Sequence, residues 1–185
     1  MIPIIGLDPG HGVGERYRNT GAVGPTWVYE RHKALELALM VRDRLSLSHT
    51  VVMTRVEDQF VPNRQRAVIA NRVSADLFLS FHFNGFHLPR ATGTETLCFP
   101  NSRLGSRLAE SVQSEMVSFL GLPDRGVKHR GDLVVLSATS MPAILIEPLF
   151  ITNPHEEKLL LDKEVMQGLA EAIATGVRNY LATVL

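Results

Sequence analysis

The chain has 185 residues, of which 45% are hydrophobic, and this is enough for one domain with a substantial core. We therefore expect a single domain over residues 1–185. The 19 Lys and Arg residues balance 19 Asp and Glu residues, so no excess positive charge is available to neutralise a long phosphate backbone. This argues against a nucleic-acid partner. The one cysteine, Cys98, excludes an intramolecular disulfide.

The hydropathy of the chain argues against membrane insertion. No stretch approaches the roughly 20 apolar residues that a membrane-spanning helix requires. The N-terminus reads as a first strand that runs into a Gly-rich loop, whereas a secretory signal needs a charged start, a longer apolar stretch and a small-residue cleavage site. We expect a soluble monomer without a signal peptide.

Apolar runs and segments with helical periodicity alternate along the chain. In chain order we expect a strand at 2–8, a loop at 10–24, a helix at 27–45, a strand at 51–54, a helix at 64–73, a strand at 75–82, a strand at 94–99, a helix at 102–119 with Ser102 as its N-cap, strands at 133–136 and 143–147, and a final helix whose apolar stripe over 165–181 packs on the sheet. This order predicts an α/β fold with a twisted, mostly parallel sheet of about six strands and helices on both faces.

Polar residues directly follow three of the expected strands. His11 follows the first strand through Asp-Pro-Gly, His82 closes the strand at 75–82, and Glu147 closes the strand at 143–147. Ligands of open α/β sheets bind beyond the carboxyl ends of the strands, so we expect these side chains to meet at one rim. Two histidines and a carboxylate are the ligand set of many catalytic zinc sites, in which the fourth position is open for water.

Such a site needs a third ligand and a base, and the sequence offers two glutamates. Glu30 opens the first helix, after the Gly-rich loop returns from His11, which would bring its carboxylate over the same rim. Glu147 is then free to act as the base. It lies within an apolar run, where an unpaired charge costs several kcal/mol, so it requires a metal, a cation or a raised pKa.

Each of these residues also has a purely structural interpretation. A histidine at a strand end is commonly a hydrogen-bonded structural residue, and Glu30 suits the first turn of a helix because of the helix dipole. The glycines of the loop at 10–24 suggest a phosphate-binding loop, but no Gly-Lys-Ser/Thr ending follows them. No serine lies in a Gly-x-Ser-x-Gly elbow, and Cys98 is expected in the core rather than as a nucleophile.

A series of motifs spread over nearly the whole chain resembles one family, the zinc-dependent N-acetylmuramoyl-L-alanine amidases of the third amidase class, which degrade bacterial peptidoglycan. The motifs are Leu-Asp-Pro-Gly-His-Gly at 7–12, Glu30, Thr-Arg at 54–55, Arg-Ala-Val-Ile-Ala-Asn at 66–71, Ala-Asp-Leu-Phe-Leu-Ser-Phe-His-Phe-Asn at 75–84, Arg-Gly-Val-Lys at 125–128, Met-Pro-Ala-Ile-Leu-Ile-Glu at 141–147 and Phe-Ile-Thr-Asn at 150–153. Their order and spacing together are specific, although each motif alone is weak.

The resemblance implies one catalytic zinc ion held by His11, Glu30 and His82, with Glu147 as general acid/base. The implied substrate is the amide between muramic acid and L-alanine of the peptidoglycan stem peptide. Asp8 and Asn84 are candidates for orienting the two histidines, although turn formation explains both equally well. Alternative functions are a zinc carboxypeptidase-type peptidase and a catalytically dead module that binds the cell wall.

Two features of the sequence depart from the family pattern or bear on regulation. Phe83 stands where the family has a small residue, so we expect it to narrow the cleft or contact the stem peptide, and Pro-Leu at 148–149 stands where a glycine is common. Regulated division amidases carry a long insertion with a helix that plugs the zinc, whereas residues 84–125 leave no room for one. We therefore expect an open site.

The expected place of action is the cell wall or periplasm. Without a signal peptide, the chain would be a phage or prophage lysin made in the cytoplasm, or a domain excised from an exported protein.

Overall fold

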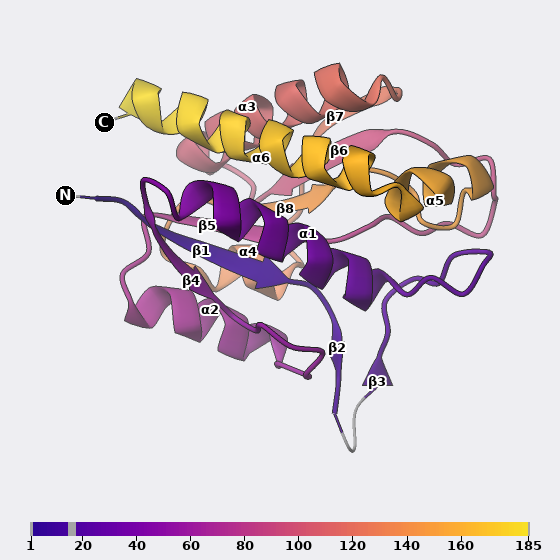
Figure 1. The fold of residues 1–185 in the computed structure, drawn as a ribbon. Helices are drawn as coiled ribbons and strands as arrows, with labels where there is room; N and C mark the ends of the chain where they lie inside the picture. The colour runs from indigo at the N-terminus through magenta and orange to yellow at the C-terminus, as the bar shows by residue number, and fades with distance from the viewer. Residues whose placement is uncertain (1, 15–17, 185) are drawn as a thin grey trace.

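A six-stranded sheet forms the centre of the fold (Figure 1). The structure, a computed structural model, describes residues 2–14 and 18–184. In sheet order the strands are β4 (Thr50–Met53), β1 (Ile4–Pro9), β5 (Leu77–Phe81), β8 (Ala143–Glu147), β6 (Thr94–Cys98) and β7 (Asp124–His129). Neighbouring strands are parallel except β6 and β8, which pair antiparallel. The predicted α/β fold with a mostly parallel sheet is therefore confirmed.

Helices cover both faces of this sheet, as expected. One face carries α1 (Glu30–Leu45), α3 (Arg103–Leu120) and α6 (Lys163–Val184), and the other carries α2 (Asn63–Arg72) and α4 (Val134–Ser137) (Figure 1). The short α5 (Pro154–Leu161) packs beside α6, and β2 (Gly12–Val13) pairs with β3 (Arg18–Asn19) in a small antiparallel ribbon. No helix in the described part of the chain is long and apolar enough to cross a membrane.

The alternation of side chains along the strands gives each face its own core and places polar groups at one end. Leu79 and Ile146 belong to the larger core under α1, whereas Phe78 and Leu145 belong to the smaller core beside α4. Because side chains two residues apart lie on the same face of a strand, Glu147 projects from the α4 face, beyond Leu145. Glu147 therefore lies at the carboxyl end of the sheet, on the face that α4 covers.

The stripe on the final helix packs differently from the prediction. Its members Leu169, Ile173, Val177 and Leu181 are buried as expected, but α6 lies mainly against α1 and α3 rather than directly on the strands. A Cβ atom at Gly176 would lie 2.7 Å from the Val112 Cα atom, so the missing side chain allows a close crossing with α3.

Several elements differ from the sequence prediction, including the β2–β3 ribbon within the expected loop at 10–24. Residues 133–136 were expected to form a strand but lie at the start of α4, because a short apolar run does not distinguish a strand from a buried helical turn. The edge strand β7 was not predicted, since its charged and largely exposed sequence lacks the apolar run that marks an inner strand. The helix α5 was also missed, although Asn153 caps it and a proline occupies its first turn.

Candidate metal centre

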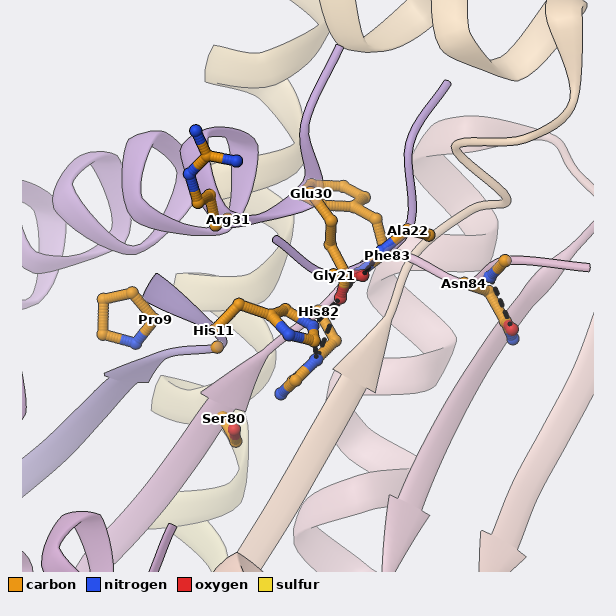
Figure 2. A network of polar contacts seen from close by, with 12 residues as sticks. Pro9, His11, Gly21, Ala22, Glu30, Arg31, Ser80, His82, Phe83 and Asn84 are labelled. Carbon is orange, nitrogen blue, oxygen red and sulfur yellow. Dashed lines mark hydrogen bonds and ion pairs between the residues drawn. The ribbon is translucent and has the colours of Figure 1, made fainter. Parts of the chain in front are cut away.

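His11, Glu30 and His82 bring one ligand atom each to a single point (Figure 2). His11 Nε2 lies 2.7 Å from Glu30 Oε1, and His82 Nδ1 lies 2.9 Å from the same oxygen and 3.0 Å from His11 Nε2. Among the described residues, this is the one group of His, Cys, Asp and Glu side chains whose geometry suits a metal ion. The two imidazoles and one carboxylate that were predicted to converge therefore do so.

The glycines of the first loop make room for these ligands. A Cβ atom at Gly10 would lie 2.4 Å from two atoms of the His82 ring, and one at Gly21 would lie 2.4 Å from Glu30 Oε2. Gly21 also has a φ of 68°, a conformation that favours glycine. Two glycines of the pattern that suggested a phosphate loop, Gly10 and Gly21, are thus explained by close packing against the candidate ligand side chains.

Glu30 is fixed by backbone amides from two segments. The Ala22 amide donates to Glu30 Oε2 at 2.6 Å, and the Phe83 amide donates to Oε1 at 3.1 Å. Burial alone would raise the pKa of this carboxyl, but hydrogen bonds from His11 and His82 outweigh burial and hold its pKa well below the usual range. Glu30 is therefore an anionic side chain, and thus a candidate ligand, held in place from the start of α1.

The side chain of Phe83 does not reach the site. It is 1% exposed and packs in the larger core, so the expectation that it narrows the cleft or contacts the stem peptide is wrong. The second departure from the family pattern is Pro-Leu at 148–149, and Leu149 is likewise fully buried. Both departures affect packing beneath the site rather than its surface.

Asn19 orients His11 and was not identified from the sequence. Asn19 Oδ1 lies 2.8 Å from His11 Nδ1, on the opposite edge of the ring from Glu30. A proton on Nδ1, donated to Asn19, leaves the lone pair of Nε2 free to bind a metal.

Removal of the Asn19 acceptor should weaken metal binding. Asn19→Ala is expected to lower zinc affinity about 10- to 100-fold, because the His11 tautomer and ring orientation are no longer fixed. Asn19→Asp keeps an acceptor and should retain most of the affinity. Competition with a chromogenic chelator measures both variants, and wild-type affinity in Asn19→Ala would contradict the assigned contact.

Two buried arginines hold the segment that carries His11. His11 has a φ of 62°, which is strained for a residue with a Cβ atom. Arg66 donates to the carbonyls of Pro9 and His11, both at 2.5 Å, and Arg55 donates to those of Pro9 and Gly10 at 2.9 and 2.7 Å. These five-donor side chains satisfy the carbonyls of the strained turn.

Asp8 supports this arrangement rather than either histidine ring. Its carboxylate accepts from Arg66 Nη1 at 2.7 Å, from the Thr54 hydroxyl at 2.5 Å and from the Ser80 hydroxyl at 2.7 Å. The residue is fully buried. Asp8 therefore acts on His11 indirectly, by fixing Arg66.

The buried pair of Asp8 and Arg66 should be essential for stability. Arg66→Leu is expected to lower the free energy of unfolding by about 3–5 kcal/mol, because it leaves the Asp8 charge buried without its partner. Urea unfolding of the metal-free protein measures the change. Addition of Asp8→Asn to Arg66→Leu removes the unpaired carboxylate charge and should recover part of the lost free energy of unfolding. A loss below about 1 kcal/mol in Arg66→Leu alone would contradict this account.

The Asn84 amide points away from the metal centre (Figure 2). Its nitrogen donates to Glu95 Oε1 at 2.7 Å. The structure thus places Asn84 where it orients Glu95 on β6, instead of the His82 ring that the sequence suggested as its partner.

Glu147 lies at the end of β8 with an unused oxygen. Its Oε2 is one of two buried side-chain polar atoms without a hydrogen-bond partner among the described residues. Burial, followed by the nearby charges of Glu30 and Glu95, raises the pKa of Glu147 well above its usual value. An unpartnered carboxyl of this kind beside three convergent ligands is a feature of functional sites.

This raised pKa predicts that Glu147 destabilises the metal-free protein at neutral pH. The unfolded chain releases the proton at a lower pH than the folded chain does, so stability falls as the pH rises above the usual carboxyl pKa. Glu147→Gln removes this effect. Its gain in melting temperature over the wild type, both in chelator, should be small at about pH 4 and grow toward about pH 7. A gain that is independent of pH would contradict the raised pKa.

The metal centre is partly open. The His11 and His82 side chains are 17% and 18% exposed, and both border a small cavity on the α4 side together with Asn19, Arg66 and Val134. Between Asn84 and Arg125 the described chain contains one strand, β6, and one helix, α3, which packs against α6 on the other face of the sheet. Within the described residues, no helix from this region covers the site.

A family model described as N-acetylmuramoyl-L-alanine amidase matches residues 5–179. The chain belongs to this family. The amidase AmiC of Neisseria meningitidis is 31% identical over 98% of this chain, and this chain spans about half of the length of AmiC. The endolysin of Bacillus phage SPP1 is 32% identical over 98% of this chain and 67% of the endolysin. The alignment with AmiC runs over 225 positions, so that amidase carries additional residues within the matched region.

Solved amidase structures share the fold. An N-acetylmuramoyl-L-alanine amidase from Clostridium difficile 630 superposes with a TM-score of 0.93 at 35% identity, covering all of this chain and 99% of its own. The catalytic domain of the amidase CwlV from Paenibacillus polymyxa superposes with a TM-score of 0.91 at 32% identity, covering 98% and 99%. The whole described fold is therefore that of an amidase catalytic domain.

Proposed function

We propose that this protein is a zinc-dependent N-acetylmuramoyl-L-alanine amidase that cleaves the bond between muramic acid and the L-alanine of the peptidoglycan stem peptide. The observation that carries the proposal is the convergence of His11, Glu30 and His82 beside the unpartnered oxygen of Glu147. Two imidazole nitrogens and one carboxylate suit zinc, and a site with three protein ligands is typical of catalytic rather than structural zinc. Membership of the amidase family supports the choice of substrate.

In the proposed reaction the protein supplies ligands and a proton carrier. Zinc, when bound, makes water more acidic and polarises the amide carbonyl. Glu147 Oε2 accepts a proton from the water whose oxygen attacks the carbonyl carbon, and then donates that proton to the alanine nitrogen as the C–N bond breaks. The products are the lactyl carboxylate and a stem peptide with a free amino group. A raised pKa suits Glu147, because it must hold the proton between the two transfers.

The proposed place of action is the bacterial cell wall. The named relatives include amidases, an endolysin of phage SPP1 and a sporulation-specific amidase of Bacillus subtilis. The partly open site favours an enzyme that needs no displacement of a covering helix before it binds its substrate.

Analysis of the products tests the proposal. Digestion of purified peptidoglycan should release intact stem peptides that carry a new L-alanine amino terminus, which dansylation followed by mass spectrometry detects. Release of single C-terminal amino acids would instead indicate a carboxypeptidase. Binding to the wall without release of any peptide would indicate a module without catalytic activity.

A further inference from the structure

Arg125 is positioned by an ion pair and by an aromatic ring. It lies near the start of β7, and its Nε donates to Glu95 Oε2 at 2.7 Å. The guanidinium carbon lies 5.0 Å from the centre of the Phe150 ring, over its face. A carboxylate on one side and an aromatic ring on the other fix the plane of the guanidinium.

Glu95 connects this arginine to Glu147. The two glutamates are direct partners in the antiparallel pairing of β6 and β8, so their Cβ atoms are about 5 Å apart on the same face of the sheet. The second oxygen of Glu95 accepts from the Asn84 amide at 2.7 Å. Both oxygens of Glu95 are thus occupied, and Glu95 on β6 lies between Arg125 on β7 and the proposed general acid/base, Glu147, on β8.

Arg125 retains unused hydrogen-bonding capacity. Its side chain is 41% exposed, and beyond the bond to Glu95 it makes one long contact, from Nη1 to the Thr92 carbonyl at 3.4 Å. Within residues 2–14 and 18–184, Nη2 has no acceptor at hydrogen-bond distance. An oriented guanidinium with a free, solvent-facing edge is suited to bind a carboxylate.

We propose that Arg125 binds the free α-carboxylate of the stem residue that follows L-alanine, a glutamate joined to the peptide through its side-chain carboxyl. This inference rests on the proposed amidase function. One residue advances an extended chain by at most about 3.6 Å, so this carboxylate lies within about two residue lengths of the cleaved bond. Arg125 lies two strands from Glu147, about 10 Å between their backbones, and its side chain extends toward Glu95 on the strand between them. Arg125 is then a specificity residue that distinguishes a carboxylate from a carboxamide at this position.

Two disaccharide tetrapeptides that differ only in this group test the proposal. One carries the free α-carboxylate and the other the carboxamide, and kcat/KM is measured for each with the wild-type holoenzyme, with Arg125→Gln and with Arg130→Gln. Arg130 is an exposed arginine paired with Asp132, so its variant is a control for loss of one positive charge. Wild type and Arg130→Gln should favour the carboxylate substrate about 10- to 100-fold.

Arg125→Gln should reduce this preference to about 1, through loss of activity on the carboxylate substrate with little change on the carboxamide. If Arg125 acts only by holding Glu95 in place, Arg125→Gln should lower kcat/KM equally for both substrates. That result, or a wild type that shows no preference between the substrates, would overturn the proposal while leaving the amidase function intact. If the wild type does not cleave either substrate between the muramoyl group and L-alanine, the proposed function itself is wrong and this inference is wrong with it.

Discussion

Replacement of Glu147 by glutamine should lower kcat by about 10²- to 10⁴-fold while the metal stays bound. The glutamine amide cannot accept the proton of the attacking water or return it to the alanine nitrogen, but it occupies nearly the same volume at the end of β8. The three ligand side chains are untouched, because no hydrogen bond joins them to Glu147 Oε2. Release of soluble stem peptide measures turnover, and mass spectrometry of the washed protein measures the metal.

The matched control for this variant is Glu110→Gln. Glu110 is an exposed residue on α3, so the same chemical change should leave both turnover and metal content at wild-type values. Wild-type turnover in Glu147→Gln would show that another group carries the proton. Loss of the metal from Glu147→Gln would show that Glu147 is a ligand and that the roles assigned to the two glutamates are wrong.

Replacement of His82 by alanine should abolish both metal binding and activity. The remaining ligands, His11 and Glu30, provide two of the three protein groups that a catalytic zinc site uses. The His82 ring also packs edge-on against His11, with 4.7 Å between ring centres, so its loss frees the neighbouring ligand as well. Metal content after dialysis and peptide release are the two measurements.

His155→Ala controls for the loss of an imidazole. His155 is exposed in the first turn of α5, and its replacement should not change either measurement. If His82→Ala binds one metal ion as tightly as the wild type does, the proposed ligand set is wrong, even if activity is lost.

Much of the metal centre could be predicted from the sequence because its residues follow strand ends. His11, His82 and Glu147 each terminate an apolar run, and parallel strands bring their carboxyl ends to one rim. The roles of the two glutamates could be distinguished because Glu30 lies at the start of α1, where the loop that returns from His11 places it beside that histidine. The structure places all four side chains at this rim, and the division of their roles remains a prediction for the variants above.

The supporting contacts could not be predicted, because they depend on register and loop geometry. Asn19 lies in the two-residue strand β3, within a segment that the sequence marks only as a Gly-rich loop, and nothing in its sequence context indicates that it lies against the His11 ring. Glu95 and Glu147 lie opposite each other because β6 pairs antiparallel with β8. A prediction of mostly parallel strands does not identify this pair of strands or their register. Phe83 follows a predicted ligand directly, yet the alternation of side chains turns it into the core.

The most direct test of the account combines metal content with the identity of the cleaved bond. The protein should contain one zinc ion per chain, lose cleavage of defined muropeptides after treatment with a chelator, and regain it when zinc is restored. The product should carry a new amino terminus on L-alanine. Cleavage at the same bond by protein that has been shown to be free of metal would contradict the central claim.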